Sequence, residues 1–470
     1  MLPRSMLRLR TADDDVLAGL DRIRTEFAVP GAFPAAALAE AEAAAAAPPP
    51  ALEDLREVPF FTLDPAGSMD LDQAMWLERR PGGHRVRYAI ADVAHFVRPG
   101  GALDAEAHER GVTLYLPDVK APLHPPALSE GAGSLLPGAD RPAAVWTIDL
   151  DEAGLITDVD VRRALVRSRD RLAYTGASTA DPRIALLCEV GRALLAAEAA
   201  RGGVSLPLPE QEVVHGWDGW TLEQRGDLAA EEWNAQISLL AGRAAAALML
   251  DGGVGLLRTM PPAPAEAVAK LRRAARALGV DWPDDRPYGE VMRGLNPARA
   301  KDAALLYEAP ALMRGAGYTA FDGERPASPE HAAVAAPYAH VTAPIRRLAD
   351  RFATEVCLAL AAGRPVPGWA REALPGLPEV MRRSLRRAGD VERACVDLVE
   401  SLLLSGHVGE VFDAVVVEAN EGKPGGLVQL AEPAVLAKCE GEGLPLGRPV
   451  KVRLREADPS RRLVRFALTG

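Results

Sequence analysis

The pattern of hydrophobic and polar positions divides the chain into three regions. From about residue 58 to residue 166 the pattern is that of short strands separated by Gly- and Pro-containing turns. Between residues 182 and 404 it is typical of helices, with long ones expected over 184–201, 228–250, 345–362 and 379–404. Short β-segments are expected over 409–419, 426–430, 449–455 and 462–468. The sequence therefore predicts a mixed α/β domain followed by a small all-β unit.

The first 50 residues are Ala-rich and predict two helices. One is expected from Asp13 to about Phe27, and the other from Pro34 to Ala46. Three prolines at 48–50 then read as a stiff linker. Two such helices would form a helical hairpin, either a helix-turn-helix or an arm docked on the next domain. We favour the docked arm, because no recognition-helix pattern is visible. The expected domains are 1–50, 51–405 and 406–470.

The balance of charge limits the kinds of partner. With a net charge of -11, the protein is not a whole-surface nucleic-acid binder, so any such contact requires a local basic groove. The C-terminal stretch 446–470 is basic, and it includes Arg453 and Arg455. About 65 residues of short strands suit a small OB barrel. Its basic residues are either solvated strand faces or a surface that follows an RNA backbone, in which case Arg453 and Arg455 bind RNA.

Cysteine usage and hydropathy point to the cell interior. The four cysteines are widely scattered and form no CxxC pair, which indicates buried reduced thiols. No run of 18 apolar residues exists, and the N-terminus lacks the apolar region of a signal peptide. We expect a cytoplasmic protein with no membrane contact.

The stretch from Leu63 to Met75 carries the candidate chemistry. Asp64, Asp70 and Asp72 lie within nine residues, and Gln73 follows them. In an extended chain Asp70 and Asp72 would share one face, and the turn after Asp64 could bring that residue onto them. Such a cluster suits a hard divalent cation with oxygen ligands. Taken alone, the stretch fits a solvated acidic loop better than a metal site, because charge clusters usually face water.

Five segments in order resemble the signatures of the ribonuclease II (RNB) family of exoribonucleases. They are DPAGSMDLDQ (64–73), IADVAH (90–95), GVTLYLPD (111–118), PPALSEGAGSLLPG (125–138) and PYAHVTAPIRR (337–347). The resemblance implies an RNB catalytic domain of mixed α+β fold over roughly 56–405, followed by an OB-type RNA-binding barrel. It also implies a 3′→5′ exoribonuclease that degrades single-stranded RNA to nucleoside 5′-monophosphates, using one or two Mg²⁺ ions, with Mn²⁺ as an alternative.

The resemblance also assigns roles to single residues. Metal binding is implied for Asp64, Asp70, Asp72 and Gln73, and catalysis for Asp70, Asp72 and Arg346. RNA contacts are implied for Tyr115, Tyr174, Leu206, Glu231, Arg346 and Arg347. Among these, Arg346 is expected at the scissile phosphate, Tyr174 at the last nucleotide and Glu231 at the terminal ribose.

Three departures from the family pattern modify these expectations. Gln73 stands where the family has a fourth Asp, which removes one charge from the metal site. Leu206 stands where Phe often stacks on the terminal base. The first 50 residues cannot hold the family's cold-shock barrels, so we expect a more open RNA clamp and better tolerance of structured RNA. We expect a monomer. The alternatives are a catalytically silent RNA-binding protein, as Gln73 permits, and a nuclease acting on single-stranded DNA.

Overall fold

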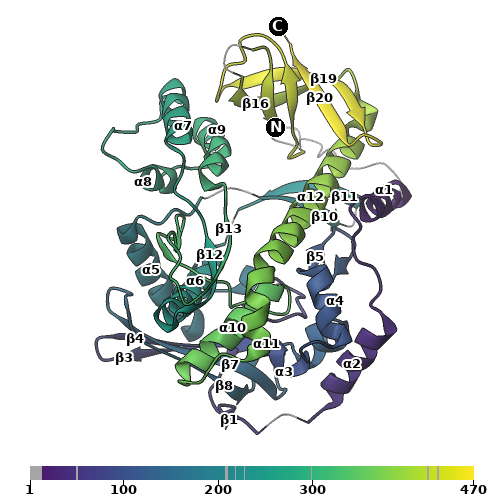
Figure 1. Ribbon diagram of the computed structural model, residues 1–470. Helices are drawn as coiled ribbons and strands as arrows, with labels where there is room; N and C mark the ends of the chain where they lie inside the picture. The colour runs from purple at the N-terminus through teal and green to yellow at the C-terminus, as the bar shows by residue number, and fades with distance from the viewer. Residues whose placement is uncertain are drawn as a thin grey trace.

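The fold consists of a large twisted sheet covered by helices and a separate β-barrel joined to it by one long helix (Figure 1). A computed structural model describes residues 13–48, 51–206, 210–216, 219–226, 228–297, 299–420, 423–430 and 433–469. The expected mixed α/β domain followed by an all-β barrel is confirmed.

A seven-stranded sheet forms the centre of the large domain, in the order β1-β8-β7-β4-β3-β2-β9. Its strands are β1 (Glu53–Asp54), β2 (Phe61–Asp64), β3 (Gln73–Arg80), β4 (Gly83–Ala91), β7 (Arg141–Asp151), β8 (Ile156–Val166) and β9 (Asp170–Ala173). The strands β3 and β4 form a hairpin, and the strands from β8 to β2 pair in antiparallel fashion. The sheet ends in two parallel pairs, β1 with β8 and β2 with β9.

The two faces of this sheet bury different hydrophobic clusters because successive side chains point to opposite sides. On β4, Tyr88 and Ile90 belong to the larger cluster, whereas Ala89 and Ala91 belong to the smaller one. The larger cluster includes residues of α5 (Pro182–Arg201), α6 (Ala229–Gly252) and α10 (Leu348–Ala361). The smaller one includes residues of α2 (Ala35–Ala46), α3 (Val93–Phe96) and α4 (Ala102–Arg110).

The remaining elements surround this sheet. Three helices, α7 (Ala265–Leu278), α8 (Tyr288–Arg293) and α9 (Ala300–Glu308), share a small core of their own. The two-stranded pairs are β5 (Leu114–Tyr115) with β6 (Lys120–Ala121), β10 (Glu210–Gly216) with β11 (Gly219–Arg225), β12 (Val254–Thr259) with β13 (Gly317–Asp322), and β14 (Glu330–His331) with β15 (Ala336–Pro337). A π-turn covers Leu128–Ala132, and 3-10 turns cover Tyr174–Gly176, Ala309–Met313, Leu374–Gly376 and Ser405–His407.

The C-terminal unit is a closed five-stranded barrel at the end of α12 (Leu377–Leu404), which α11 (Gly368–Ala373) precedes. Figure 1 shows α12 running from beside the sheet up to the barrel. The strands are β16 (Val411–Ala419), β17 (Gly426–Leu430), β18 (Leu436–Glu440), β19 (Pro449–Asp458) and β20 (Leu463–Leu468). The sequence pattern predicted four of them and missed β18, a five-residue strand that follows a Pro-containing turn.

The N-terminal segment holds the two predicted helices, but they do not form a helical hairpin. Helix α1 (Asp13–Glu26) lies against α12 near the barrel, whereas α2 lies against α4 (Figure 1). Arg462 of the barrel makes a bidentate ion pair with Glu26, and Arg24 makes one with Asp118. The helix-turn-helix interpretation is therefore wrong, and the segment is an arm docked on the rest of the protein.

Other details of the sequence prediction are corrected by tertiary contacts. The motif IADVAH spans the end of β4 at Ala91 and the start of α3 at Val93. The hairpin β10–β11 and the antiparallel pair β12–β13 were not predicted. All four cysteines are free and buried, as expected. Within the described ranges, no helix combines the length and apolar character needed to cross a bilayer.

Candidate active site

A serine from a distant segment fixes the backbone of the acidic stretch through two hydrogen bonds. After β2 the chain turns through Gly67, whose φ of 86° favours glycine. The Ser134 hydroxyl then donates to the Met69 carbonyl at 2.6 Å and accepts from the Leu71 amide at 2.9 Å. Leu71 is fully buried, so its two acidic neighbours face the other way, into a cavity. The SLLPG segment, which is one of the five sequence motifs, therefore contributes Ser134 to the site as a support for the acidic stretch.

This cavity brings most of the predicted site residues together. It encloses about 600 Å³. Its walls include Asp64, Asp70, Asp72, Gln73, Tyr115, Tyr174, Glu231, Asn234, Ser238, Tyr338, Thr342, Arg346 and Arg347. The segment from Tyr338 to Arg347 comes from more than 260 residues further along the chain than Asp72, so only the tertiary fold joins them.

Asp72 is the most deeply buried carboxylate of the site. It is 3% exposed, and it accepts a hydrogen bond from the Ile345 amide at 2.7 Å and one from Arg346 Nε at 3.2 Å. Burial raises the pKa of Asp72 to about 7, although the nearby Arg346 charge and the Ile345 amide lower it. Within the described residues the Nη groups of Arg346 make no hydrogen bond, so they are available to a phosphate.

Asp64 ends strand β2 with an oxygen that has no partner. Its Oδ2 is buried and makes no hydrogen bond within the described structure, and burial raises the pKa of Asp64 to about 6. Nearby, Asn234 of α6 donates to the Tyr174 hydroxyl at 2.6 Å, and its own Oδ1 is buried with no partner among the described residues. The sequence interpretation missed Asn234, because an Asn on a helix carries no signal of the cavity it faces.

Asp70 has protein partners on both oxygens. Lys120 Nζ lies 3.0 Å from Oδ1, and the Tyr115 hydroxyl donates to Oδ2 at 3.3 Å. Lys120 also pairs with Glu130 at 2.7 Å. Burial opposes the charge of Lys120, but its bonds to Glu130 and Asp70 outweigh burial and raise its pKa. Lys120 and Glu130 were not recognised from the sequence.

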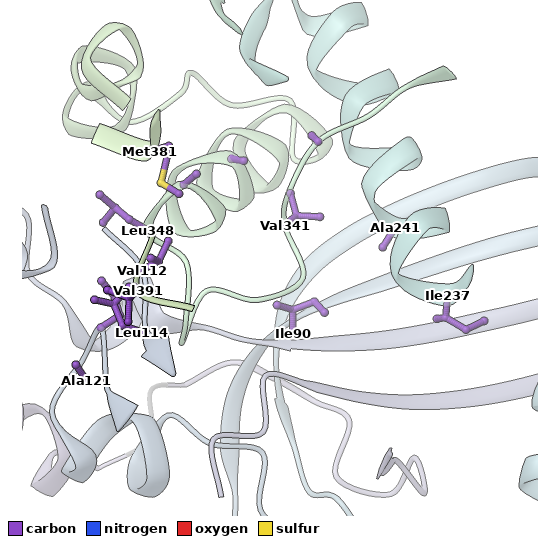
Figure 2. Close-up of a cluster of buried hydrophobic side chains, with 14 of the residues drawn as sticks. Ile90, Val112, Leu114, Ala121, Ile237, Ala241, Val341, Leu348, Met381 and Val391 are labelled. Atoms are coloured by element: carbon purple, nitrogen blue, oxygen red, sulfur yellow. The ribbon is translucent and has the colours of Figure 1, made fainter. Parts of the chain in front are cut away.

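The segment 338–350 is fixed by hydrogen bonds to one of its own carboxylates, that of Asp350. Asp350 accepts from the Ala343 amide at 2.7 Å and from both Nε and Nη2 of Arg347, at 2.5 and 2.8 Å. Figure 2 shows Val341 of this segment beside α6, which carries Ala241, and above Ile90, and all three residues belong to the larger hydrophobic cluster. The guanidinium of Arg347 is thus bound to Asp350, which favours a structural role over the predicted RNA contact.

Gln73 is also oriented by this segment. Its Nε2 donates to the Thr342 carbonyl at 2.5 Å. The amide nitrogen is therefore used as a donor, and Oε1 is the atom that could bind a cation or accept a hydrogen bond from water.

The other predicted RNA-binding residues lie in less direct positions. Glu231 lines the cavity, but its carboxylate also binds Arg225 and accepts from the Leu228 amide at 2.8 Å. Leu206 lines a neighbouring cavity of about 570 Å³, which shares the α6 residues Ala235 and Leu239 with the first.

The two barrel arginines lie on β19, outside both cavities. Both are exposed, and Arg453 also donates to the Gly409 carbonyl. Four of the neighbouring barrel cations are paired with carboxylates: Lys451, Arg461, Arg462 and Arg465. These four cations share three carboxylates, those of Asp413, Glu456 and Glu26, so only part of the local basic charge is neutralised within the protein.

The oxygen atoms in the cavity suit a divalent cation for which the protein supplies only some of the ligands. In the described ranges, no three acidic, histidine or cysteine side chains converge as a closed metal cage. Mg²⁺ usually binds one or two carboxylates and keeps waters and substrate phosphate as its other ligands. Asp64, with its unpartnered buried oxygen, together with Asp72 and Gln73, fits such an open site.

Comparison with known families agrees with this geometry. The RNB domain matches residues 52–356, and the RNase II-type exonuclease C-terminal S1 domain matches residues 410–469. The chain belongs to the RNB family. The expected resemblance and the barrel at its C-terminal end are thereby confirmed.

Individual relatives show how far the likeness extends. Ribonuclease R of Escherichia coli is 27% identical, over 88% of this chain and 57% of that protein, so the chain spans about half the length of the curated relatives it matches. Ribonuclease R of Mycoplasma genitalium, solved with ribose-methylated single-stranded RNA, shares the RNB fold at a TM-score of 0.86 and 18% identity, covering 97% of this chain and 78% of that one. Yeast Ssd1, described as a pseudonuclease, matches at a TM-score of 0.72 and 16% identity, covering 95% of this chain and 57% of that one.

Proposed function

We propose that this RNB protein is a metal-assisted 3′→5′ exoribonuclease that hydrolyses single-stranded RNA to nucleoside 5′-monophosphates. The observation that carries the proposal is the convergence of Asp64, Asp72 and Arg346 on one cavity, although Arg346 lies 274 residues beyond Asp72. Aromatic side chains that could hold a strand line the same cavity. The proposed catalytic unit spans residues 51–405, and the barrel at 406–470 assists RNA binding.

The residues of the cavity divide the work of phosphodiester hydrolysis. Asp64, Asp72 and Gln73 would hold Mg²⁺ or Mn²⁺, which supplies charge to the phosphate and acidifies a bound water. The Nη groups of Arg346 bind the scissile phosphate and stabilise the negative charge that develops there. Asp72 fixes Arg346 through Nε, so the guanidinium is oriented before the substrate arrives.

The substrate's chain and ribose are held by residues further along the cavity. The Tyr115 ring is 55% exposed, which leaves a face on which a base can stack whatever the sequence. Glu231 and the unpartnered Oδ1 of Asn234 offer acceptors to ribose hydroxyls, which DNA lacks at the 2′ position. We therefore propose RNA, rather than single-stranded DNA, as the substrate, and a monomer as the active form.

The test is incubation of a 5′-labelled single-stranded RNA with Mg²⁺ or Mn²⁺. We expect a ladder that shortens from the 3′ end, release of 5′-monophosphates, and no reaction with EDTA. Asp72→Asn should keep the hydrogen bond from Ile345 and retain RNA binding while losing cleavage. Equal cleavage by Asp72→Asn and the wild type would refute the assignment. A DNA oligomer of matched sequence tests the substrate class.

A second candidate is an RNA-binding protein without catalysis. It is favoured by Gln73, which removes one charge from the site, and the RNB fold occurs in yeast Ssd1, which is described as a pseudonuclease. In that case wild type and Asp72→Asn would bind RNA equally and neither would cleave it. Gln73→Asp separates the two functions further, because a fourth carboxylate should raise metal affinity in an active enzyme.

A further inference from the structure

We propose that the Lys120 ammonium is a built-in cation of the active site, which occupies Asp70 and limits the site to one divalent ion. The inference rests on the proposed function and deepens it. It concerns a lysine to which neither the sequence resemblance nor the family comparison assigns a role.

The first observation is the position of Lys120 on the short hairpin β5–β6. Tyr115 and Lys120 are directly paired across the two strands, so their side chains leave the same face. Both reach Asp70, the hydroxyl to Oδ2 at 3.3 Å and the ammonium to Oδ1 at 3.0 Å. The hairpin therefore delivers a stacking ring and a positive charge to one carboxylate.

The second observation is that Lys120 joins two acids. Its Nζ lies 2.7 Å from Glu130 on the π-turn as well as 3.0 Å from Asp70. Two carboxylates sharing one small cation is the arrangement that a divalent ion would otherwise make. A lysine ammonium is charged at neutral pH and is a compact point charge, so it can take that place.

The third observation is the contrast with Asp64. The Oδ2 of Asp64 is buried and unpartnered, whereas both oxygens of Asp70 have protein partners. Without Lys120, a cation from solution would have to balance the negative charge of Asp70. Lys120 and the neutral Gln73 both make the site less negative, and both therefore disfavour a second divalent ion. The site then holds one ion beside the unpartnered Oδ2 of Asp64, and Lys120 supplies the other positive charge.

The test counts Mn²⁺ ions bound to the full chain, using the electron paramagnetic resonance signal of free Mn²⁺. Wild type should bind one ion per chain in the site. Lys120→Met should bind a second ion, or bind Mn²⁺ at least about tenfold more tightly. Without the lysine charge, the carboxylates of Asp70 and Glu130 are left unbalanced and attract a divalent cation. Lys120→Arg keeps the charge and should behave as wild type. The double variant with Asp70→Asn should return to one ion.

Matched controls separate the role of Lys120 from other failures. Lys301→Met removes an exposed lysine of α9 and should leave Mn²⁺ binding unchanged. Circular dichroism of each variant shows whether it folds, and Lys120→Gln provides a second neutral substitution. Unchanged Mn²⁺ number and affinity in both neutral variants would overturn the inference. RNA cleavage by the same wild-type preparation tests the proposed function separately, since Mn²⁺ counting requires no turnover.

Discussion

Glu400 is a buried carboxylate at the junction between α12 and the barrel, and its replacement by Gln has a calculable effect. It is 4% exposed. Its Oε1 accepts from the Leu436 amide of β18 and from Gln211 Nε2 of β10, both at 2.9 Å. Burial raises its pKa from 4.5 to about 7; these two hydrogen bonds lower the pKa, and Asp397 one turn earlier raises it further.

The sign of the pH dependence follows from this shift. Because the folded-state pKa of Glu400 lies above the unfolded value, the folded protein binds the proton more tightly. The stabilising contribution is therefore full below the unfolded value of 4.5 and is lost as the pH rises through about 7. Each pH unit of that interval corresponds to about 1.4 kcal/mol, which gives a total of about 3 kcal/mol.

Glu400→Gln keeps an acceptor for Leu436 and Gln211 but never ionises. We expect the free energy of unfolding of the variant, relative to wild type, to increase by roughly 2 to 3 kcal/mol between about pH 5 and about pH 8. Urea unfolding followed by tryptophan fluorescence measures this difference at each pH. The comparison across pH removes any constant packing effect of the substitution.

Glu392→Gln is the matched control, because Glu392 is an exposed acid on the same helix. It should show no pH-dependent difference from wild type. If the difference between Glu400→Gln and wild type were the same at both pH values, Glu400 would not titrate in this interval, and the burial argument would be refuted.

Substitutions at four further positions test the active site and two helices, α6 and α12. Arg346→Lys removes the guanidinium fork and should lower kcat by about 10²-fold or more, with a smaller change in KM, in single-turnover cleavage. Tyr115→Leu should weaken RNA binding by about 1–3 kcal/mol for any base sequence, whereas Tyr115→Phe should keep most of it, as measured by fluorescence anisotropy. Gly242→Ala places a Cβ 2.1 Å from the Tyr338 ring, so it should lower the free energy of unfolding by about 1–3 kcal/mol and lower activity as well. Gly389→Ala, where the Cβ meets only a flexible arginine at 3.5 Å, should instead stabilise by about 0.4–1 kcal/mol.

Local patterns in the sequence were sufficient for most elements of the fold. The expected bounds of β17, 426–430, agree with the structure residue for residue, and the two N-terminal helices lie where the chain pattern places them. Such features depend on neighbours a few residues away, whose preferences are written in the chain itself. The order of five motifs also identified the family, because their spacing does not require knowledge of the contacts they make.

The composition of the active site was decided by tertiary structure. Ser134 holds the acidic stretch open from 63 residues away, Asn234 reaches the Leu63 carbonyl across 171, and Lys120 reaches Asp70 across 50. Neither the charge pattern nor the periodicity distinguishes these residues from solvated ones, since their roles arise only when distant segments pack together. Asp64, Asp70 and Asp72 were determined by the sequence as candidates. Which of them has an oxygen free for a metal, and which one is already bound by a lysine, was determined only by the fold.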